Sequence, residues 1–403
     1  MATIIQKYFK GDKPLWSFIL MLSIFSFLPV YSASSNLVYT VGTGTVFSHL
    51  LKHGIFLLIG ILIIYLVQKC DYRYFGIFAL TAVVIFGILL IFTLVQGQTI
   101  GGANASRWIM IPGIGVGIQP STIASQALLI YIARFLTKNR DKEYNWNIVG
   151  LQLLVPMIVI IGLIFPSNGS TALMLAIMSA TLLIIGGFPM KYLMVIGGVG
   201  AFLGGLFIWT ALTFADSFSN NRVHTWISRI EKFTSDQAQT TLESYQVVHA
   251  KAAIARGVTE MAGPGKSVFK QTLPQSSSDF IFAIIVEEYG AIGAILLVLT
   301  FLLILFRICV IASKIHTVFG TLLVFAVGIP IIFQAMINMA VAVNLIPVTG
   351  QPLPMISYGG TAMWMTCVSF GIILSVSTQI KSNEELALER KRYTNQDDIE
   401  DIA

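Results

Sequence analysis

Ten apolar runs divide this chain of 403 residues, and each is long enough to cross a lipid bilayer as one helix. A helical crossing takes roughly 20 apolar residues. The runs lie at about 16–34, 51–68, 74–96, 118–136, 147–165, 171–189, 191–214, 280–306, 317–343 and 358–380. We therefore predict an all-α polytopic membrane protein with ten transmembrane helices.

The placement of charge predicts how these helices are oriented. Charged residues make up only 11% of the chain, against about a quarter in soluble domains. Most of the 25 Lys and Arg residues fall in loops on the same side as the N-terminus, so the positive-inside rule places both termini in the cytoplasm. Topology explains the net charge of +6, and no nucleic-acid partner is expected. The first run is followed by YSASS and resembles a signal peptide, but nine further spans favour an uncleaved helix.

The longest connection, residues 216–279, joins the seventh and eighth runs on the outer face. Its segment RVHTWISRIEKF, at 222–233, has the apolar spacing of a helix lying in the membrane interface. A second helix is predicted over ESYQVVHAKAAIARG, with Gly257 as its C-cap. We treat residues 1–403 as one membrane domain, in which 381–403 form a cytoplasmic tail.

The second half of this outer loop is basic. Between positions 244 and 278 the charged residues are Lys251, Arg256, Lys266, Lys270 and a single acid, Glu260. Such a local excess indicates that an anionic group binds nearby.

Three carboxylates follow in the stretch LPQSSSDFIFAIIVEEYG, residues 273–290. Counting outward from Arg307, Glu287 and Glu288 fall at the outer hydrocarbon boundary. Asp279 would lie roughly 12 Å farther out if the helix is continuous, at the depth of lipid headgroups. Asp279 is therefore either a helix N-cap or a catalytic group. The two glutamates are either interface anchors or partners of loop arginines.

Several classes of function are disfavoured. No Asp, Glu, Lys or Arg occupies the middle of any apolar run, whereas ion-coupled transporters usually need such residues. The five histidines are scattered along the sequence, the three cysteines form no metal or disulfide pattern, and GPGKS lacks the context of a phosphate loop. The charge that could do chemistry lies at the outer face.

Two other outer motifs are notable. GGANASRWIMIPG places Arg107 beside Trp108, which suits an interfacial anchor or a phosphate clamp. NLIPVTGQPLPMISYGG, at 344–360, is too rich in proline and glycine for a helix, so near membrane depth it must be buried or line a cavity. Gln334 and Asn338, one turn apart, are interpreted as helix–helix contacts.

Together, GANASRWI, QPS, LPQSSSDFIFAIIVEEYG and PVTGQPLPMISYGG resemble the SEDS family of cell-division, elongation and sporulation proteins. The resemblance covers nearly the whole chain and implies ten transmembrane helices with the long outer loop between the seventh and eighth. It also implies a peptidoglycan glycosyltransferase that acts on lipid II, in which Asp279 is the essential aspartate. The GANASRWI wording and the charged tail favour the cell-division branch, FtsW, over the elongation branch, RodA.

Two departures from the family pattern stand out. The family usually has QPSE and a lysine three residues later, where this chain has Thr122 and Ser125. Losing both partners of an ion pair can be nearly neutral, whereas losing one strands a charge. The family's PDLG-like turn is also replaced, by PSNGS at 166–170.

The resemblance implies specific roles. Asp279 would accept the proton of the attacking sugar hydroxyl, and a single displacement would invert the anomeric carbon. The candidates for binding substrate and its pyrophosphate are Arg107, Lys270, Arg256, Arg222 and Glu288. A divalent cation, Mg²⁺ or Mn²⁺, could assist.

The implied setting is the bacterial cytoplasmic membrane, at the division septum. The expected partners are lipid II, membrane lipids, a class B penicillin-binding protein and other divisome proteins. A lipid II flippase and a non-catalytic divisome scaffold are the alternatives.

Overall fold

The computed structural model describes residues 10–39, 42, 44–96, 108–110, 117–140, 142–213 and 242–380. The predicted interfacial helix at 222–233 and the tail at 381–403 lie outside the described residues.

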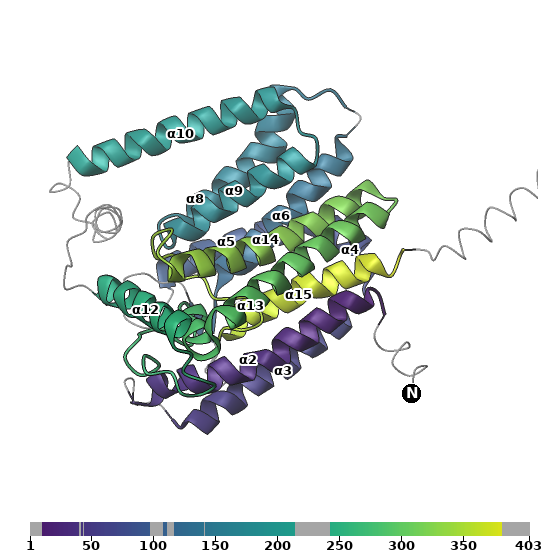
Figure 1. Cartoon of the computed structure of the whole chain (residues 1–403). Coiled ribbons are helices and arrows are strands. Elements are labelled where there is room, and N and C mark those ends of the chain that lie inside the picture. The colour runs from purple at the N-terminus through teal and green to yellow at the C-terminus, as the bar shows by residue number, and fades with distance from the viewer. Residues whose placement is uncertain are drawn as a thin grey trace, which may run out of the picture.

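Each of the ten apolar runs lies on a helix or a short series of helices (Figure 1). In chain order the helices are α2 (Lys13–Tyr39), α3 (Val46–Val67), α4 (Arg73–Ile77), α5 (Ala79–Gln96), α6 (Pro120–Lys138), α7 (Trp146–Ile148), the π-helix η1 (Val149–Leu154), α8 (Val155–Ile164), α9 (Gly169–Ile185), α10 (Met190–Thr213), α12 (Leu242–Thr259), α13 (Ile281–Lys314), α14 (Val318–Ala342) and α15 (Gly360–Ser377). The two short strands β1 (Ile109–Met110) and β2 (Gly117–Ile118) pair antiparallel, with Ile109 opposite Ile118.

Within the described part of the chain, six helical segments are long and apolar enough to cross a membrane. They comprise α2, α3, the α7–η1–α8 series, α13, α14 and α15. Shorter apolar helices coincide with α5, α9 and α10. The protein is therefore an all-α, multi-pass membrane protein.

Helix α6 differs from its neighbours because its first two turns carry several polar side chains, yet it lies inside the bundle, packed against α5, α9 and α14 (Figure 1). Its hydroxyl and amide residues include Ser121, Thr122, Ser125 and Gln126, and most of the helix is buried. Polar side chains on a transmembrane helix normally face the bundle interior. The polarity of α6 thus indicates an internal polar region.

The fifth apolar run contains a π-helix just before Pro156. Proline has no N–H to donate to the carbonyl four residues earlier, which belongs to Gln152. The hydroxyl of Tyr131, on α6, donates to this carbonyl at 2.5 Å. A side chain of the neighbouring helix therefore satisfies the backbone where the run departs from α-helical geometry.

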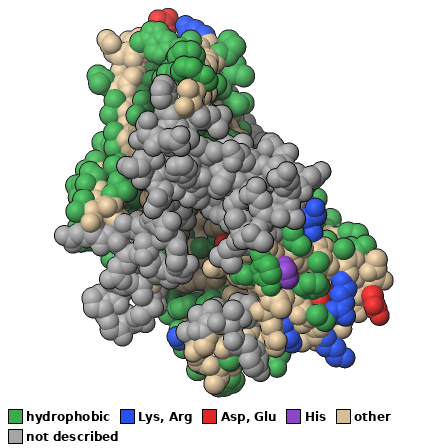
Figure 2. Space-filling view, turned by 90° about the vertical axis from the view of Figure 1, so that its left-hand side faces the viewer, with side chains coloured by type: hydrophobic (Ala, Val, Ile, Leu, Met, Phe, Trp, Pro, Cys, Tyr) green, Lys and Arg blue, Asp and Glu red, His purple; other side chains and the backbone are tan. Residues whose placement is uncertain are grey.

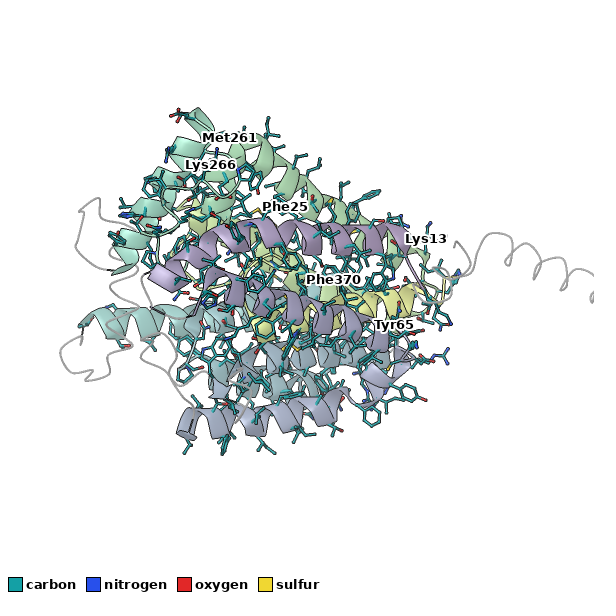
Figure 3. All side chains as sticks on the ribbon, turned by 90° about the horizontal axis from the view of Figure 1, so that it is seen from below. Lys13, Phe25, Tyr65, Met261, Lys266 and Phe370 are labelled. Carbon is teal, nitrogen blue, oxygen red and sulfur yellow. The ribbon has the colours of Figure 1, made fainter. Side chains whose placement is uncertain are left out.

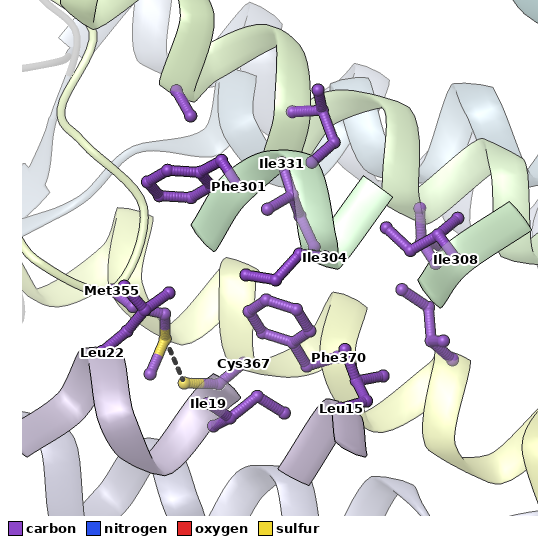
Figure 4. Close-up of a cluster of buried hydrophobic side chains, with 14 of the residues drawn as sticks. Leu15, Ile19, Leu22, Phe301, Ile304, Ile308, Ile331, Met355, Cys367 and Phe370 are labelled. Carbon is purple, nitrogen blue, oxygen red and sulfur yellow. Dashed lines mark hydrogen bonds between the residues drawn. The ribbon is translucent and has the colours of Figure 1, made fainter. Parts of the chain in front are cut away.

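Two hydrophobic clusters hold the bundle together, and α14 contributes to both. In the first, Phe370 of α15 is fully buried among side chains of α2 and α13, including Leu15 and Ile304 (Figure 4). The Sγ of Cys367 lies 3.8 Å from the Sδ of Met355 in the same cluster (Figure 4). The second cluster joins α5, α6, α8 and α9.

Helix α13 is not one continuous helix, because Gly290 has φ 67° and ψ −166°. Only glycine adopts this backbone conformation readily. The kink separates the segment 281–289 from the longer apolar segment below it. Asp279 also precedes the first helical residue, Ile281, so the roughly 12 Å offset predicted for a continuous helix does not give its depth.

The prediction that Gly257 ends its helix is wrong, because α12 continues to Thr259. A Cβ on Gly257 would lie 2.1 Å from the carbonyl oxygen of Val286 on α13. Glycine is needed here for close contact between α12 and α13, not for a C-cap.

The start of α2 and the end of α3 lie at the opposite end of the bundle from the loop that follows α12. Lys13 and Tyr65 lie at one end, and Met261 and Lys266 lie at the other (Figure 3). Helix α10 stands away from the other helices (Figure 1), and large apolar side chains such as Met194, Phe202 and Trp209 are exposed on it. This surface is suited to lipid or to a partner helix.

Candidate active site

Asp279 ends an irregular segment that precedes α13. The N-cap position of α13 belongs to Phe280, whose side chain makes no capping hydrogen bond. Asp279 therefore lies one residue before the N-cap position. The Asp279 side chain is only partly buried, whereas Phe280 and Ile281 beside it are fully buried.

The side chain of Asn338, on α14, fixes the backbone at Asp279. Its Nδ2 donates to the Asp279 carbonyl at 2.8 Å and to the Gln351 carbonyl at 2.7 Å. Asn338 is 1% exposed, so solvent competes little for these bonds. Sequence reasoning assigned Asn338 to helix–helix contact and missed this role.

The segment 344–360 is bonded directly to the Asp279 segment, as its proline and glycine content predicted for a buried piece. The Ser357 hydroxyl donates to the Ser278 carbonyl at 2.6 Å. The Tyr358 N–H donates to the Ser277 carbonyl at 2.8 Å. Residues 277–279 are thus held from two sides, by α14 and by the segment before α15.

A cavity of about 90 Å³ has a wall residue, Gly350, close to Asp279, although Asp279 is not itself part of the described wall. Gly350, which has φ +70°, forms part of its wall, and a Cβ on Gly350 would lie 3.5 Å from Oδ2 of Asp279. The hydrogen-bonding side chains of the wall are Gln119, Thr122, Ser125, Gln126, Thr171, Gln334, Gln351, Thr366 and Ser369. The cavity therefore joins α6, α9, α14 and α15 around the segment that carries Gly350.

The two positions that depart from the family pattern, Thr122 and Ser125, both line this cavity. The Ser125 hydroxyl donates to the Ser121 carbonyl at 2.7 Å on the same helix. No Asp, Glu, Lys or Arg belongs to the described wall of the cavity. Its interior is polar and uncharged.

Glu287 is 0% exposed, and its carboxylate holds the loop that follows α12. It accepts from the Val268 N–H at 2.8 Å and from the Ser267 hydroxyl, and it pairs with Arg256 Nη1 at 3.4 Å. Arg256 was predicted to bind pyrophosphate. Here it lies against Glu287, which agrees with the alternative that the glutamates are partners of loop arginines.

Glu288 is also 0% exposed and holds two other elements together. Its carboxylate accepts from the Ser32 hydroxyl of α2 and from the Ser267 N–H, the latter at 3.3 Å. Lys270 donates from Nζ to the Gly265 carbonyl at 2.7 Å in the same loop. Together with Glu287, the predicted residues Arg256, Lys270 and Glu288 form a second group, in which the two glutamates fix the loop 262–270 to the first segment of α13.

Arg107 and Arg222 lie outside the described residues, so their positions stay predictions. Figure 2 shows the face on which α12 lies. There Lys and Arg side chains gather over α12 and the loop after it, and exposed Lys251 and Lys266 belong to these elements.

The five histidines are scattered along the sequence, but His49 and His53 share one face of α3. Both rings contact the ring of Tyr358, at centroid distances of 5.9 and 6.2 Å. His53 Nε2 lies 2.8 Å from the Ser26 hydroxyl. Among the described residues, no three His, Cys, Asp or Glu side chains are grouped as ligands of a metal ion.

Comparison with known families gives a match over almost the whole chain. The model of the cell cycle protein family FtsW/RodA/SpoVE matches residues 13–382. A probable peptidoglycan glycosyltransferase FtsW of Halomonas elongata is 28% identical over 368 residues, covering 90% of this chain and 89% of that protein. A protein of the same name in Geobacter metallireducens is 30% identical over 363 residues, covering 89% and 92%.

Solved structures share the fold. A chain of a peptidoglycan synthase complex superposes with a TM-score of 0.72 at 22% identity, covering 93% of this chain and 99% of that one. The rod shape determining protein RodA of Thermus thermophilus gives a TM-score of 0.64 at 22% identity, covering 93% and 98%.

Proposed function

Because this chain belongs to the FtsW/RodA/SpoVE family of cell cycle proteins, we propose that it is a peptidoglycan glycosyltransferase. It would polymerise lipid II into β-1,4 glycan strands at the outer face of the cytoplasmic membrane. The relatives named as probable FtsW proteins support a role in septal wall synthesis.

The proposed topology has ten transmembrane helices with both termini in the cytoplasm. The nine apolar helical segments supply nine crossings, and α6 supplies the tenth because its polar side chains face the bundle interior. Residues 216–279 then form an outer loop, within a single membrane domain of residues 1–403. In this arrangement Asp279, α12 and the loop 262–270 all lie at the outer end.

The observation that carries the proposal is the position of Asp279, held by its backbone beside an uncharged polar cavity. A glycosyl transfer needs a base within reach of the attacking hydroxyl. It also needs a site that orients the sugar so that the reacting atoms meet. A partly buried carboxylate next to a hydrogen-bonding cavity provides both.

In the proposed reaction, the 4-hydroxyl oxygen of the acceptor sugar attacks the anomeric carbon of the donor. Asp279 accepts the hydroxyl proton as the new C–O bond forms. The bond from the anomeric carbon to the pyrophosphate oxygen breaks, and polyprenyl pyrophosphate leaves. One displacement inverts the α-linked donor to a β-linkage. No carboxylate belongs to the described cavity wall, and we propose no covalent intermediate.

The basic residues of the outer loop would hold the pyrophosphate while its charge develops. Lys251 and Lys266 are exposed on α12 and the loop after it, and Lys270 lies in the same loop. Arg107 and Arg222 stay candidates for this role, and Arg256 can contribute only if it leaves Glu287. No step is assigned to a metal ion.

The partner we propose is a class B penicillin-binding protein, which would cross-link the new strand. The similar chain from a peptidoglycan synthase complex supports this choice. Apolar side chains exposed along α13, such as Ile295 and Leu302, offer a surface for a partner helix within the membrane.

A lipid II flippase is the alternative that the polar cavity favours, because a flippase needs a polar path for the headgroup. An assay of purified protein on fluorescent lipid II, with and without its partner, separates the two. Glycan strands formed by the wild-type protein and not by the Asp279→Asn variant support the proposed enzyme. Transbilayer movement of lipid II with no strand formation under any condition would contradict it.

A further inference from the structure

The cavity beside Asp279 is built for an uncharged ligand group. Its hydrogen-bonding side chains are amides and hydroxyls, and no charged side chain belongs to its described wall. A charge buried without a partner costs far more than a buried amide or hydroxyl that finds a hydrogen bond. The pyrophosphate of a lipid-linked sugar therefore does not belong in this cavity, but its neutral sugar groups do.

The buried amide nitrogen of Gln126, in the cavity wall, lacks a partner among the described residues. Gln126 is 8% exposed, and its Nε2 has no hydrogen-bond partner among the described residues. Buried polar groups are nearly always bonded to protein, water or ligand. The unpaired N–H donors of Gln126 thus call for an acceptor, such as a carbonyl oxygen, inside the cavity.

Two buried oxygen atoms without a partner in the described chain lie near the segment that carries Asp279. Oδ1 of Asn338 and Oγ1 of Thr349 are buried with no partner in the described chain. Asn338 is bonded to Gln351 of the wall, and Thr349 precedes Gly350 of the wall. These two residues do not belong to the cavity wall, but the wall itself offers acceptor oxygens, such as those of Gln334 and Thr366. A ligand group with both a carbonyl oxygen and an N–H matches a wall that holds the Gln126 donor and these acceptors.

The volume of the cavity and the apolar side chains in its wall limit which group of the substrate it can hold. A volume of about 90 Å³ has room for several water molecules and hence for a small substituent that displaces them. Met174, Met178 and Met365 also line it, and methionine packs adaptably against small apolar groups. A substituent with a carbonyl, an N–H and a methyl group is an acetamido group.

We propose that this cavity is the subsite for the N-acetamido group of a hexosamine, with Gln126 donating to the acetamido carbonyl. The inference rests on the proposed function and assigns the cavity to the acceptor sugar. In a hexosamine, the 2-acetamido and 4-hydroxyl groups are carried by one rigid ring. Holding the first in the cavity therefore fixes the second relative to Asp279.

Binding measurements test the subsite without requiring turnover. Thermal unfolding of the purified full-length protein would be followed at rising concentrations of lipid II. The same titration would use a lipid II analogue that carries glucose in place of the terminal N-acetylglucosamine. This analogue lacks the acetamido group and adds no charge. We expect the wild-type protein to bind lipid II about tenfold more tightly than the analogue, as for the loss of one buried hydrogen-bonded group.

The Gln126→Leu variant should lose this preference, binding both compounds with the weaker affinity. Gln68→Leu is the matched control, because Gln68 is a buried glutamine at the inner end of α3 and away from the cavity wall. It should keep the tenfold preference. If Gln126→Leu unfolds, Gln126→Met provides the same test with a more adaptable side chain.

Equal binding of the two compounds by the wild-type protein would overturn the subsite, as would a preference retained in the Gln126 variant. These outcomes leave the proposed enzyme intact if the wild-type protein still makes glycan strands. Conversely, the wild-type protein could bind lipid II more tightly than the analogue and yet form no glycan strands. That result would contradict the proposed function and not the subsite.

Discussion

The Nδ2 amide of Asn338 donates to the backbone carbonyl of Asp279 across 59 positions of sequence, at 2.8 Å. The same nitrogen reaches Gln351, so α14 fixes both the carboxylate segment and the cavity wall. Asn338 therefore fixes the backbone of Asp279, and its two hydrogen bonds do not involve the Asp279 carboxylate.

Replacing Asn338 by Leu should reduce polymerisation by more than tenfold. Both carbonyls lose a buried donor, at about 1–3 kcal/mol for each unsatisfied group, and the Asp279 segment can shift. Initial rates on lipid II would be compared with those of Asn139→Leu. Asn139 is equally a buried asparagine, but its side chain bonds within its own helix at the inner end of α6. Wild-type rates in the Asn338 variant would show that the two hydrogen bonds are not needed.

The Asp279→Asn variant should make no glycan strands while keeping its thermal stability and its partner binding. The amide cannot accept the hydroxyl proton, whereas asparagine has the size of aspartate and the position is only partly buried. Glu260→Gln, at an exposed acid in the outer loop, is the control and should polymerise normally. Activity of Asp279→Asn within a few fold of wild type would remove the assignment of the base.

Neutralising basic residues of the outer face should impair use of the lipid-linked substrate more than folding. We expect Lys270→Ala and Arg107→Ala each to lower kcat/KM for lipid II by about tenfold, the effect of losing one charge-assisted contact. Each melting temperature would be measured alongside. Unchanged lipid II binding and turnover in both variants would end the pyrophosphate assignment.

Single charges at the two substituted positions of α6 should destabilise the protein. Thr122→Glu alone places an unpaired carboxylate in the uncharged cavity, at about 3 kcal/mol or more. Adding Ser125→Lys supplies a partner one turn along on the same cavity-facing side, so the double variant should recover much of the loss. Melting temperatures of the two single variants and the double variant decide this, and additive destabilisation would show that the two side chains do not pair.

Gly257→Ala should destabilise the protein severely, because the new Cβ would meet the Val286 carbonyl at 2.1 Å. The clash would push α12 from α13 and loosen the Glu287 and Glu288 contacts. Gly197→Ala on α10 is the matched control, since a Cβ there meets nothing within 4 Å in the described structure. Equal thermal stability of the two variants would contradict the close packing of α12 on α13.

Hydropathy predicted the positions of the helices because the bilayer imposes length and composition directly on the chain. It did not predict Gly257 correctly, since a glycine that ends a helix and one that admits a neighbouring helix look alike in sequence. Asp279 was found through its motif, but the role of Asn338 was missed. Its acceptors are backbone carbonyls, which any residue can supply and which leave no sequence signal.

The cavity wall and the contacts of the two glutamates also depend on how the helices pack, which the sequence does not show directly. Thr122 and Ser125 drew attention because they depart from a family pattern, whereas Gln126 did not, and only the packed helices bring the three to one wall. For Glu287 and Glu288, sequence left two alternatives. The N–H groups of Ser267 and Val268 that bind them belong to a turn whose path the sequence does not determine.

The backbone break at Gly290 divides α13 into two segments that are held by different parts of the protein. Above it, residues 281–289 are positioned by α12 and the loop 262–270, while below it Arg307 is bonded to Asp12 at the far end of the bundle. Transmembrane helices tilt to match bilayers of different thickness. We expect such a tilt of the lower segment to be taken up at Gly290, so that Asp279 keeps its contact with Asn338.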